Sequence, residues 1–573
     1  MKKSQKFCIV FVLALIFVSC APNESGLMQS NGRSSTPTQG GEIVLLIPEE
    51  PSTLNPYLSE TGVNKQVYDS VIEGLVGFDT TGNYYPILVS EIPTLDNGGV
   101  SSDFLTVTWR LREGLKWADG EPVTSKDIRF TWEAVSDLSS GALQSGGFDL
   151  ISSVETPDNL TAVVKYKDFY VGYLSQFILG IFPSHIFGSP EGMSTWEWNR
   201  SPISTGPFML EEWNPGINIV MVTNPNYREE NKPYLDRLVF SIIPSYETQL
   251  AQMREGEAHA QVWPIESKNE YDSIMGNVAQ LVVVPGLWNM ELNFNLSKPF
   301  DGDPGPVPPH PILGDVRVRR AIAYGINYDY IISEVMSGEV LPSFSPFEYG
   351  WYKCEMARPY PTNPALAIEL LESAGWLDKD NDGFRECDDC MYADDGTRLE
   401  LNLLGYSYDP DLQRTEEVLA EQLAELGIKI NIQNVDFSII FGGWSDGAPR
   451  KTGDFDLQIY DGLVEAEPQN TVVSQWFSGE IPSADNPEGR NYFRWTNAVA
   501  DGAILRAGSS PDLAVRRQAY CDLADEMAKD IPVLYLYLLR DSYGFSNRLH
   551  GYNVSTWGSL TWDVANWWID LQN

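Results

Sequence analysis

The sequence predicts an α/β protein with enough chain for two or three domains, preceded by a targeting segment. Its 573 residues exceed the roughly 100–200 that one domain usually contains. The apolar runs EIVLLI at 42–47 and LYLY at 534–537 are typical of buried strands. Residues 107–133 alternate like a strand, pass through turns and then begin a helix. Strands and helices therefore share one chain.

The targeting segment covers residues 1–20. Lys2, Lys3 and Lys6 precede an apolar run at 7–18 that is too short to cross a bilayer core of ~30 Å. The end of the segment, FVSCA at 17–21, resembles a lipobox, in which Cys20 becomes the lipidated first residue of the mature protein. The usual Leu of that motif is Phe17 here, and simple secretion after a small residue is the alternative. Lipidation would anchor the protein to the outer face of the cell membrane or in the periplasm.

Residues 21–41 are rich in Ser, Gly, Asn, Thr and Gln and lack an apolar period. This composition predicts a flexible tether between the lipid anchor and the folded body. The remaining sequence contains no further run of about 18 apolar residues, so it predicts no other membrane segment.

The chain is strongly acidic, with 39 basic against 79 acidic residues and a formal net charge of −40. Such a surface repels nucleic acid phosphates and anionic lipid headgroups, so we expect no nucleic acid partner and membrane attachment through the lipid only. The 17 Trp and 27 Tyr provide core packing and rigid walls for a binding cleft. Four histidines argue against a histidine-rich nickel or haem site.

Residues 107–133, VTWRLREGLKWADGEPVTSKDIRFTWE, predict a strand, two turns and a helix. Val107, Trp109 and Leu111 alternate with polar residues, as in a half-buried strand. Thr124 can cap the N-terminus of the following helix, and the side chain of Asp127, three residues later, can accept a hydrogen bond from the Thr124 backbone N–H. The segment alone indicates an ordinary α+β unit.

Together with other blocks in the same order, this segment resembles the bacterial extracellular solute-binding proteins of family 5, the oligopeptide, dipeptide and nickel type. The resemblance runs from about residue 42 to the C-terminus. Its blocks are EPSTLNP at 50–56, VYDSVIEGLVGFD at 67–79, YPIL at 85–88, STGPF at 204–208, NPNY at 224–227, KPYLD at 232–236, NFN at 293–295, DVRVRRAI at 315–322, ALAIELLESAGW at 365–376 and DIPV at 530–533.

The resemblance implies a two-lobe periplasmic-binding-protein clamshell with an additional inserted domain. Lobe one would be discontinuous, the inserted domain would interrupt it, and the lobes would join near Asn293 and Pro532. The implied ranges are 42–60, 200–292 and 530–573 for lobe one, 61–199 for the inserted domain and 296–529 for lobe two.

The implied function is that of the substrate-binding component of an ABC importer. The two lobes would close around a peptide by hinge motion and deliver it to permease subunits driven by cytoplasmic ATPases. The resemblance also implies a monomer without enzymatic activity. The same scaffold binding oligosaccharide or another solute, as an importer receptor or a sensor, is the alternative, and a secreted hydrolase is a third.

In the family, a carboxylate in a segment like D-x-x-x-P often holds the α-amine of the peptide. The corresponding segment here is YDGLVEAEP at 460–468, where the Asp is displaced. Asp461 or Glu465 would take its role, and the register leaves both open. Further candidates for ligand contact, chosen by their positions, are Trp288, Asn293, Trp444, Trp476 and Tyr492. Aromatic residues here would also suit an oligosaccharide.

The loop DKDNDGFRE at 378–386 has the D-x-D-x-D-G start of a calcium loop. The candidate ligands are Asp378, Asp380, Asp382, the backbone oxygen of Phe384, Glu386 and Asp389, the last in place of the usual Glu. The alternative is a polar turn. No cofactor is expected to be required beyond this structural Ca²⁺.

The body contains Cys354, Cys387, Cys390 and Cys521, which allow three disulfide connectivities. An external compartment favours oxidation. Cys387 and Cys390 are predicted to form a small disulfide on the acidic loop, because ligands for a zinc site are not found at suitable spacing. The pairing of Cys354 and Cys521 is left open.

Enzyme motifs are weak. GWSDG at 443–447 matches G-x-S-x-G, but a nucleophile elbow requires a buried strand before it and a helix after it. A loop sequence, APRKTG, follows instead. The sequence therefore predicts no catalytic residues, although scattered carboxylates leave a glycosidase pair formally open.

Overall fold

A computed structural model describes residues 36–571, apart from 138, 262–267, 299–306, 357–358 and 407–409. The chain divides into a short N-terminal unit, Met1–Pro37, and a body, Thr38–Asn573. The predicted targeting segment, Cys20 and most of the tether lie outside the described residues. Within the described ranges, no helix has the length and apolarity needed to cross a membrane.

The body is built on a ten-stranded mixed sheet with the order β15-β14-β16-β11-β17-β10-β1-β9-β8-β7. The apolar run at 42–47 forms β1, as predicted. The strands of this sheet are β1 Glu42–Ile47, β7 Phe208–Asn214, β8 Asn218–Thr223, β9 Arg237–Ile242, β10 Ala260–Gln261, β11 Ala279–Phe294, β14 Glu400–Tyr406, β15 Lys429–Val435, β16 Leu457–Leu463 and β17 Val533–Ser546.

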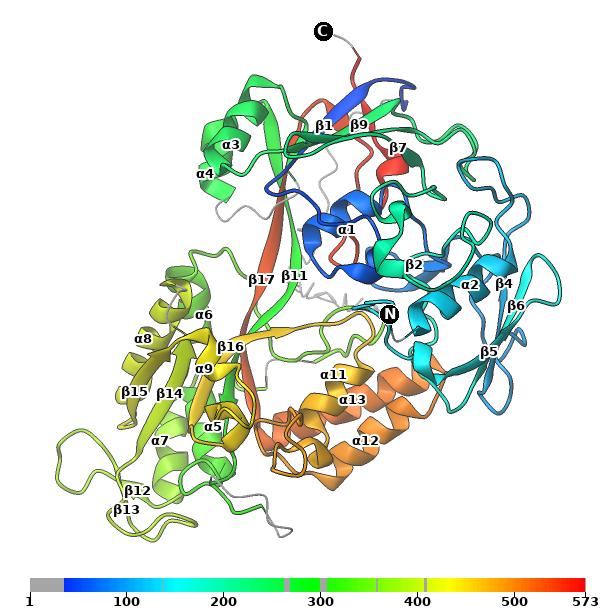
Figure 1. The fold of residues 1–573 in the computed structure, drawn as a ribbon. Helices are drawn as coiled ribbons and strands as arrows, with labels where there is room; N and C mark the ends of the chain where they lie inside the picture. The colour runs from blue at the N-terminus through cyan, green and yellow to red at the C-terminus, as the bar shows by residue number, and fades with distance from the viewer. Residues whose placement is uncertain are drawn as a thin grey trace, which may run out of the picture. The chain divides into compact units, whose positions relative to one another are not determined.

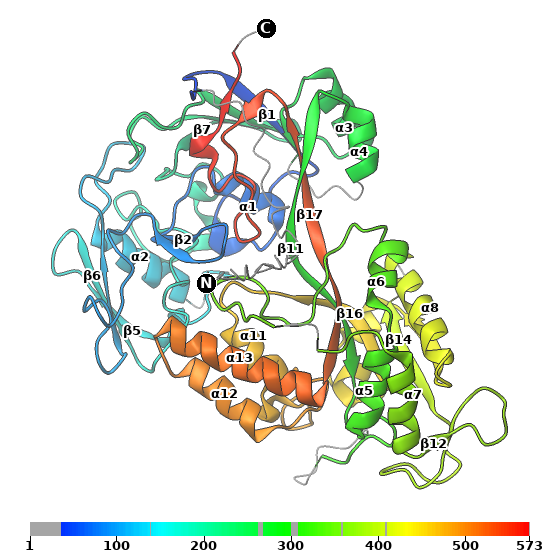
Figure 2. The same cartoon turned by 180° about the vertical axis from the view of Figure 1, so that it is seen from behind.

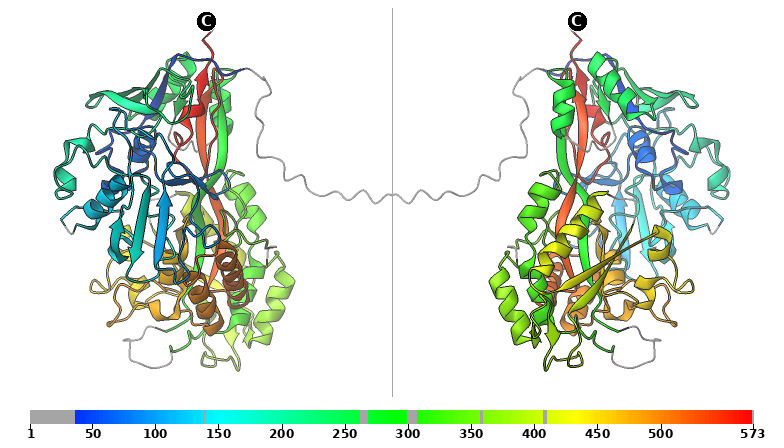
Figure 3. Two further views of the ribbon diagram at one scale, coloured as in Figure 1. Left: turned by 90° about the vertical axis from the view of Figure 1, so that its right-hand side faces the viewer. Right: turned by 90° about the vertical axis from the view of Figure 1, so that its left-hand side faces the viewer.

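Two long antiparallel strands, β11 and β17, connect the two lobes (Figure 1). They pair from Ala279 opposite Ser546 to Asn293 opposite Val533, and the register shifts between Pro285 and Asn289. On one side of this shift the strands pack into the lobe-one core, and on the other side Met290 and later residues belong to the lobe-two core. Figure 3 shows both strands running together from one lobe to the other.

This arrangement corrects the predicted boundary. The lobes were expected to join near Asn293 and Pro532, but both positions lie within lobe two. Asn293 is opposite Gln458 of β16, and Val533 contributes to a lobe-two core. The register shift near 285–289 marks the change of lobe instead, because only there do the apolar residues of β11 switch from one core to the other.

Lobe one contains the N-terminal strands of the sheet and the C-terminal residues. β1 pairs in parallel with β9 and β10, while β8 pairs antiparallel with β9 and β7. A separate small core packs the helices α3 Tyr246–Glu255 and α4 Lys268–Met275 against the sheet. Figure 2 shows these helices beside β11 and β17. Short two-stranded sheets join β2 Val76–Phe78 to β3 Tyr84–Pro86 and β18 Leu549–His550 to β19 Trp568–Ile569.

The inserted region forms a three-stranded antiparallel sheet covered by one helix. Its strands are β4 Thr106–Arg110, β5 Ile151–Glu155 and β6 Thr161–Tyr166, in the order β4-β6-β5. The predicted helix start is confirmed: α2 Ser125–Ser136 begins with a capping box in which Thr124 and Asp127 satisfy one another's backbone N–H groups. Trp109 is completely buried in a core continuous with lobe one. This segment is therefore architectural, and the inserted region has no separate core.

Lobe two has two hydrophobic cores, one packed against β14 and β16 and the other beside the start of β17. One core uses α5 Val316–Gly325, α6 Tyr328–Tyr330, α7 Pro364–Ser373 and α8 Pro410–Ala424. A second core uses α11 Gln469–Trp476, α12 Ala498–Gly508 and α13 Leu513–Asp530. The remaining short elements are α1 Gly62–Tyr68 in the inserted region, and α9 Phe437–Ile440, α10 Pro449–Thr452, β12 Trp376–Leu377 and β13 Glu386–Cys387 in lobe two.

Two disulfides are formed in lobe two. Cys354 is joined to Cys521, which ties the loop before α7 to helix α13. Cys387 is joined to Cys390, the pairing predicted from the sequence. Of the three connectivities that four cysteines allow, the structure contains this one.

Candidate ligand-binding site

The carboxyl ends of three parallel strands meet at one edge of lobe two. β14 pairs in parallel with both β15 and β16, so Tyr406, the start of α9 and Asp461 are brought together. The Tyr406 hydroxyl donates a 2.9 Å hydrogen bond to Asp461 Oδ1, and its ring lies edge-on to Phe437 with 6.1 Å between centroids. Ligands of α/β proteins bind at such edges, because the loops that follow the strands converge there.

Trp288 lies at the same edge, on the antiparallel neighbour β11. It is opposite Leu463, and Met290 is opposite Asp461, so Trp288, Asp461 and Leu463 share one face of the sheet. Trp288 is 42% exposed and Leu463 is 40% exposed. Two of the predicted contact residues, Trp288 and Asp461, are thus placed beside one another with an apolar surface open to solvent.

The opposite face of β11 and β16 is polar although it is buried. Asn289, Glu291 and Asn293 project from β11, and their cross-strand partners are Gly462, Tyr460 and Gln458. All three β11 residues are at most 5% exposed. Asn293 was a predicted contact residue, and the structure places it in this row, which we call the polar row (Asn289, Glu291, Asn293, Gln458 and Tyr460).

Glu291 is the most perturbed carboxyl of the polar row. Burial raises its pKa to about 8, and the negative charge of Asp461 adds to the rise. No ion pair to Glu291 is found among the described residues. Sequence reasoning missed this residue, although an acid within an apolar alternation (MELNF, 290–294) is itself an unusual signal.

Several polar atoms next to Glu291 are also unsatisfied. In the described part of the chain, the side-chain amide of Gln458 and the hydroxyl of Tyr535 have no hydrogen-bond partner. Gln458 is completely buried and Tyr535 is 5% exposed. Buried polar groups are nearly always hydrogen-bonded. The polar row and Tyr535 therefore offer donors and acceptors that no protein group uses.

A second carboxyl lies near the polar row. Burial raises the pKa of Glu348 to about 7, and hydrogen bonds from Ser343 and the backbone N–H of Phe344 oppose the rise. Ser343 also donates a 2.7 Å hydrogen bond to Asn289 Oδ1. Both carboxyls favour a positively charged group in their vicinity, because ionising them without one is costly.

Tyr492 and Arg450 border the polar row. The Arg450 guanidinium lies 4.2 Å from the ring centroid of Phe441 and 4.7 Å from that of Tyr492, an arrangement that stabilises the cation. Tyr492 is 6% exposed. Phe441 lies edge-on to Tyr460 of the row, with 6.0 Å between ring centroids. Trp444 is partly exposed in the turn between α9 and α10.

The G-x-S-x-G segment at 443–447 is in that same turn. A hydrogen bond of 3.2 Å from the Gly443 N–H to Asp446 closes it, and short helices flank it. A buried strand does not precede the Ser, so the segment does not form a nucleophile elbow.

Glu465 and Trp476 lie away from the polar row. The Glu465 carboxylate accepts a hydrogen bond from the Thr471 hydroxyl in helix α11, and burial raises its pKa. Trp476 is 2% exposed and stacks on Phe493, with 4.4 Å between ring centroids. The prediction that Trp476 lines a cleft is therefore contradicted: its position at the end of an amphipathic helix directs it into the core.

The two lobes meet beside helix α11. Tyr84 and Trp557 pack against the lobe-two core that contains α11 to α13, and Trp557 contacts Tyr352 with 6.4 Å between centroids. Nearby, Arg516 and Glu467 form a buried bidentate ion pair. These contacts hold α11 against the inserted region.

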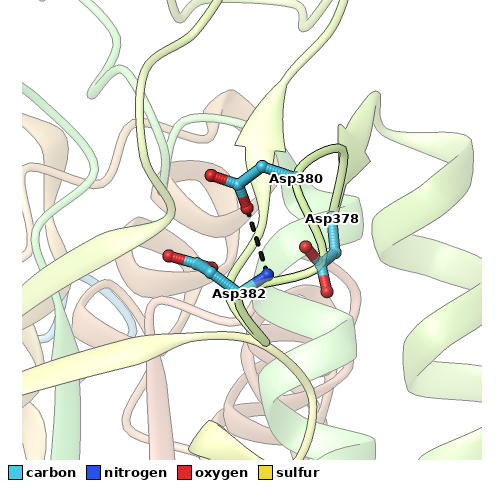
Figure 4. A group of neighbouring side chains, drawn as sticks. All are labelled: Asp378, Asp380 and Asp382. Atoms are coloured by element: carbon cyan, nitrogen blue, oxygen red, sulfur yellow. Dashed lines mark hydrogen bonds between the residues drawn. The ribbon is translucent and has the colours of Figure 1, made fainter.

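The acidic loop gathers three of the predicted calcium ligands (Figure 4). Asp378, Asp380 and Asp382 place carboxylate oxygens within 4.8 Å of one another, and all three are exposed. Within the described residues this group includes neither Glu386 nor Asp389. Glu386 pairs in β13 with Leu377, and the Asp389 N–H donates to Asp395. Asp382 already has a cation, because it forms an ion pair with Arg398.

Comparisons with known proteins agree with this architecture. The model of "Bacterial extracellular solute-binding proteins, family 5 Middle" matches residues 84–483. The oligopeptide-binding protein AppA of Bacillus subtilis is 24% identical over 576 residues, which is 98% of this chain and 97% of AppA.

Solved structures share the fold. The structure of AppA in complex with a nonapeptide has a TM-score of 0.61 at 23% identity, covering 93% of this chain and 100% of that one. NikZ from Campylobacter jejuni in complex with Ni(L-His) has a TM-score of 0.65 at 22% identity, covering 92% and 99%. The family match spans most of the body. The sequence blocks that predicted the family occur in both lobes and in the inserted region. The chain belongs to the bacterial extracellular solute-binding proteins, family 5.

Proposed function

We propose that this protein captures peptides outside the cytoplasm and delivers them to the permease of an ABC importer. The polar row carries this proposal. A peptide has an ammonium group, N–H donors and carbonyl acceptors. The row has a carboxyl without an ion pair among the described residues, at Glu291, and an unused amide at Gln458. Relatives support the same class, since AppA is described as oligopeptide-binding.

In this proposal Glu291 attracts the peptide ammonium from the polar row, and Asp461 acts on it only through its charge from the opposite face of the sheet. Asp461 raises the pKa of Glu291, so an incoming cation relieves an electrostatic cost that the free protein carries. Glu291 then takes the role that the family resemblance assigned to a displaced Asp. Glu465, with its carboxylate bound to Thr471, is less available.

Calorimetric titration with peptides of graded length tests the proposal. We expect binding without cleavage, and weaker binding after N-acetylation of the peptide. Glu291→Gln should weaken the free-amine peptide by about 2 kcal/mol or more and leave the acetylated peptide nearly unaffected. Asp525→Asn, an exposed change in α13, is the matched control. Unchanged affinity of Glu291→Gln for the free-amine peptide would exclude the amine-anchoring role.

Oligosaccharide binding is the second candidate, favoured by the exposed indole of Trp288. Sugars stack on such rings, whereas they gain little from a carboxyl at Glu291. Trp288→Ala should abolish oligosaccharide binding if this alternative holds, while Glu291→Gln should not. The same scaffold would then serve an importer or a sensor. Turnover of any substrate would contradict both receptor functions and favour a hydrolase.

Membrane attachment belongs to the same proposal. Lipidation of Cys20 would tether a monomer near its permease, and Cys20→Ser should move the protein from the membrane fraction to the soluble fraction.

We also propose that the acidic loop binds a structural Ca²⁺ ion, and that the protein requires no other cofactor. Ca²⁺ should then raise the melting temperature, and Asp380→Asn should remove the increase. A melting temperature that does not change with Ca²⁺ would contradict the calcium site and indicate that the loop is a polar turn.

A further inference from the structure

A cavity of about 370 Å³ lies in lobe one and the inserted region, whose core is continuous with that of lobe one, and it is separate from the polar row. Its lining comes from residues within 65–87 and from Ile178 of the inserted region, and from Pro207, 227–229 and residues within 557–566 of lobe one; none of these belongs to lobe two. Small-molecule sites commonly occupy about 300–1,000 Å³. We call this the lobe-one cavity.

Aromatic side chains form a large part of its wall. Tyr85 and Trp562 meet edge to face with 6.3 Å between centroids, and Phe78 and Trp557 are 6.4 Å apart. The Trp562 indole N–H donates a 2.7 Å hydrogen bond to the Asn553 carbonyl, which orients its ring. The cavity therefore offers preformed π faces.

The charges of the lining are predominantly negative. Five carboxylates and two cationic side chains line the cavity. Both cations are already paired: Arg228 with Glu73 at 2.9 Å, and Lys65 with Asp69 at 2.6 Å.

Asp563 is the remaining acid of interest. It is 7% exposed and accepts a 2.8 Å hydrogen bond from the Trp567 indole. No ion pair to Asp563 is found among the described residues. Because no ion pair compensates its charge, the ionisation of this nearly buried carboxylate is costly.

We propose that the lobe-one cavity binds a small organic cation, with the ammonium group beside Asp563 and the apolar part against Tyr85, Trp557 and Trp562. Aromatic faces attract ammonium groups, most strongly when both are removed from water. A neutral molecule of the same shape gains only the apolar contacts. The site does not depend on the peptide proposal, since none of its lining residues belongs to lobe two.

The protonation of Asp563 gives the site a pH dependence. Burial raises its pKa to about 7, while the Trp567 N–H, backbone N–H groups and the positive charge of Lys232 oppose the rise. Tyr85 lies near the same carboxyl. Burial and the negative charges of Glu73, Asp563 and Asp69 raise the pKa of Tyr85, while the positive charge of Arg228 opposes the rise. The binding form is the carboxylate, so affinity should fall by about tenfold for each pH unit well below 7.

Ligand-observed NMR and calorimetry at pH 8 test the proposal with choline and n-butylammonium as probes. Their uncharged counterparts are 3,3-dimethyl-1-butanol and 1-butanol. We expect at least one cation to bind at least tenfold more tightly than its neutral counterpart, and Asp563→Asn to lose at least tenfold in affinity. The Asn side chain retains an acceptor for Trp567, and Asp525→Asn is the matched control with unchanged binding.

Trp562→Leu is a second variant that leaves Asp563 in place. It should weaken the cation by about threefold to thirtyfold, the range expected for loss of a cation–π contact. Near-ultraviolet circular dichroism verifies that each variant is folded. The proposal is overturned if neither cation binds, if the neutral compounds bind equally, or if a folded Asp563→Asn variant binds as the wild type does.

Discussion

The carboxylate of Glu291 lies against the backbone of Gly462 on the neighbouring strand. A Cβ atom built at position 462 would be 2.1 Å from Glu291 Oε1. Glycine at this position thus leaves the space that the buried carboxyl occupies. Glu291 on β11 therefore contacts the segment 460–468, which corresponds to the segment that was expected to supply the acid for the peptide amine.

Gly462→Ala should therefore displace Glu291. We expect a loss of about 1–3 kcal/mol in the free energy of unfolding, as for other overpacked sites, together with weaker binding of a free-amine peptide. Urea denaturation and calorimetric titration measure the two effects. Gly188→Ala is a suitable control, because nothing lies within 4 Å of a Cβ at that position. Equal behaviour of the two variants would contradict the contact.

The ionisation of Glu291 predicts a pH dependence of stability. Its pKa is about 8 in the folded protein against an ordinary value of 4.5, so the folded state binds more protons than the unfolded state between these values. The free energy of unfolding should accordingly fall as pH rises from about 5 to 8, by at most about 1.4 kcal/mol per pH unit from this group.

Glu291→Gln removes that contribution, while Glu348 and Asp563, whose pKa values are also raised, contribute in the same direction in both proteins. Denaturant titrations of wild type and variant at several pH values isolate the Glu291 part by difference. A stability difference that stays constant between pH 5 and 8 would show that Glu291 does not titrate there.

The two disulfides should contribute very differently to stability. Cys354 and Cys521 are 167 residues apart, whereas Cys387 and Cys390 are separated by 3. Cross-linking a long segment restricts the unfolded chain more. The double variant Cys354→Ser with Cys521→Ser should lose about 2–5 kcal/mol, and the corresponding Cys387 and Cys390 variant much less. Melting and urea denaturation compare them, and a larger loss for the short pair would contradict this ranking.

The ion pair of Arg516 and Glu467 should behave as a unit. Arg516 is 1% exposed, so Glu467→Gln leaves a buried cation without its counter-ion and should cost about 3–5 kcal/mol. Adding Arg516→Met should recover part of that loss, since the unpaired charge disappears. Urea denaturation of both single variants and the double variant measures the coupling. Additive losses would indicate that the two charges do not interact.

Local sequence patterns were enough to predict the family, the α/β class, several elements and one disulfide. β1 and the capped start of α2 follow from apolar runs and from the Thr124 and Asp127 pair, because backbone hydrogen bonding and capping depend on nearby residues. The pairing of Cys387 with Cys390 is similarly local. Among the candidate contact residues, Trp288 and Asp461 lie together, but Trp476 belongs to the core.

The place where the lobes meet and the membership of the polar row depend on long-range strand pairing and could not be predicted from the sequence. Asn293 and Gln458 are distant in sequence, and they become neighbours through the register of β11 and β16. Glu291 acquires its raised pKa from burial by strands and helices that the sequence pattern does not place. The same holds for the lobe-one cavity, where residues 65–87 and 557–566 converge. Burial and charge proximity depend on long-range packing, whereas the patterns that identify a strand, a cap or a family block are local.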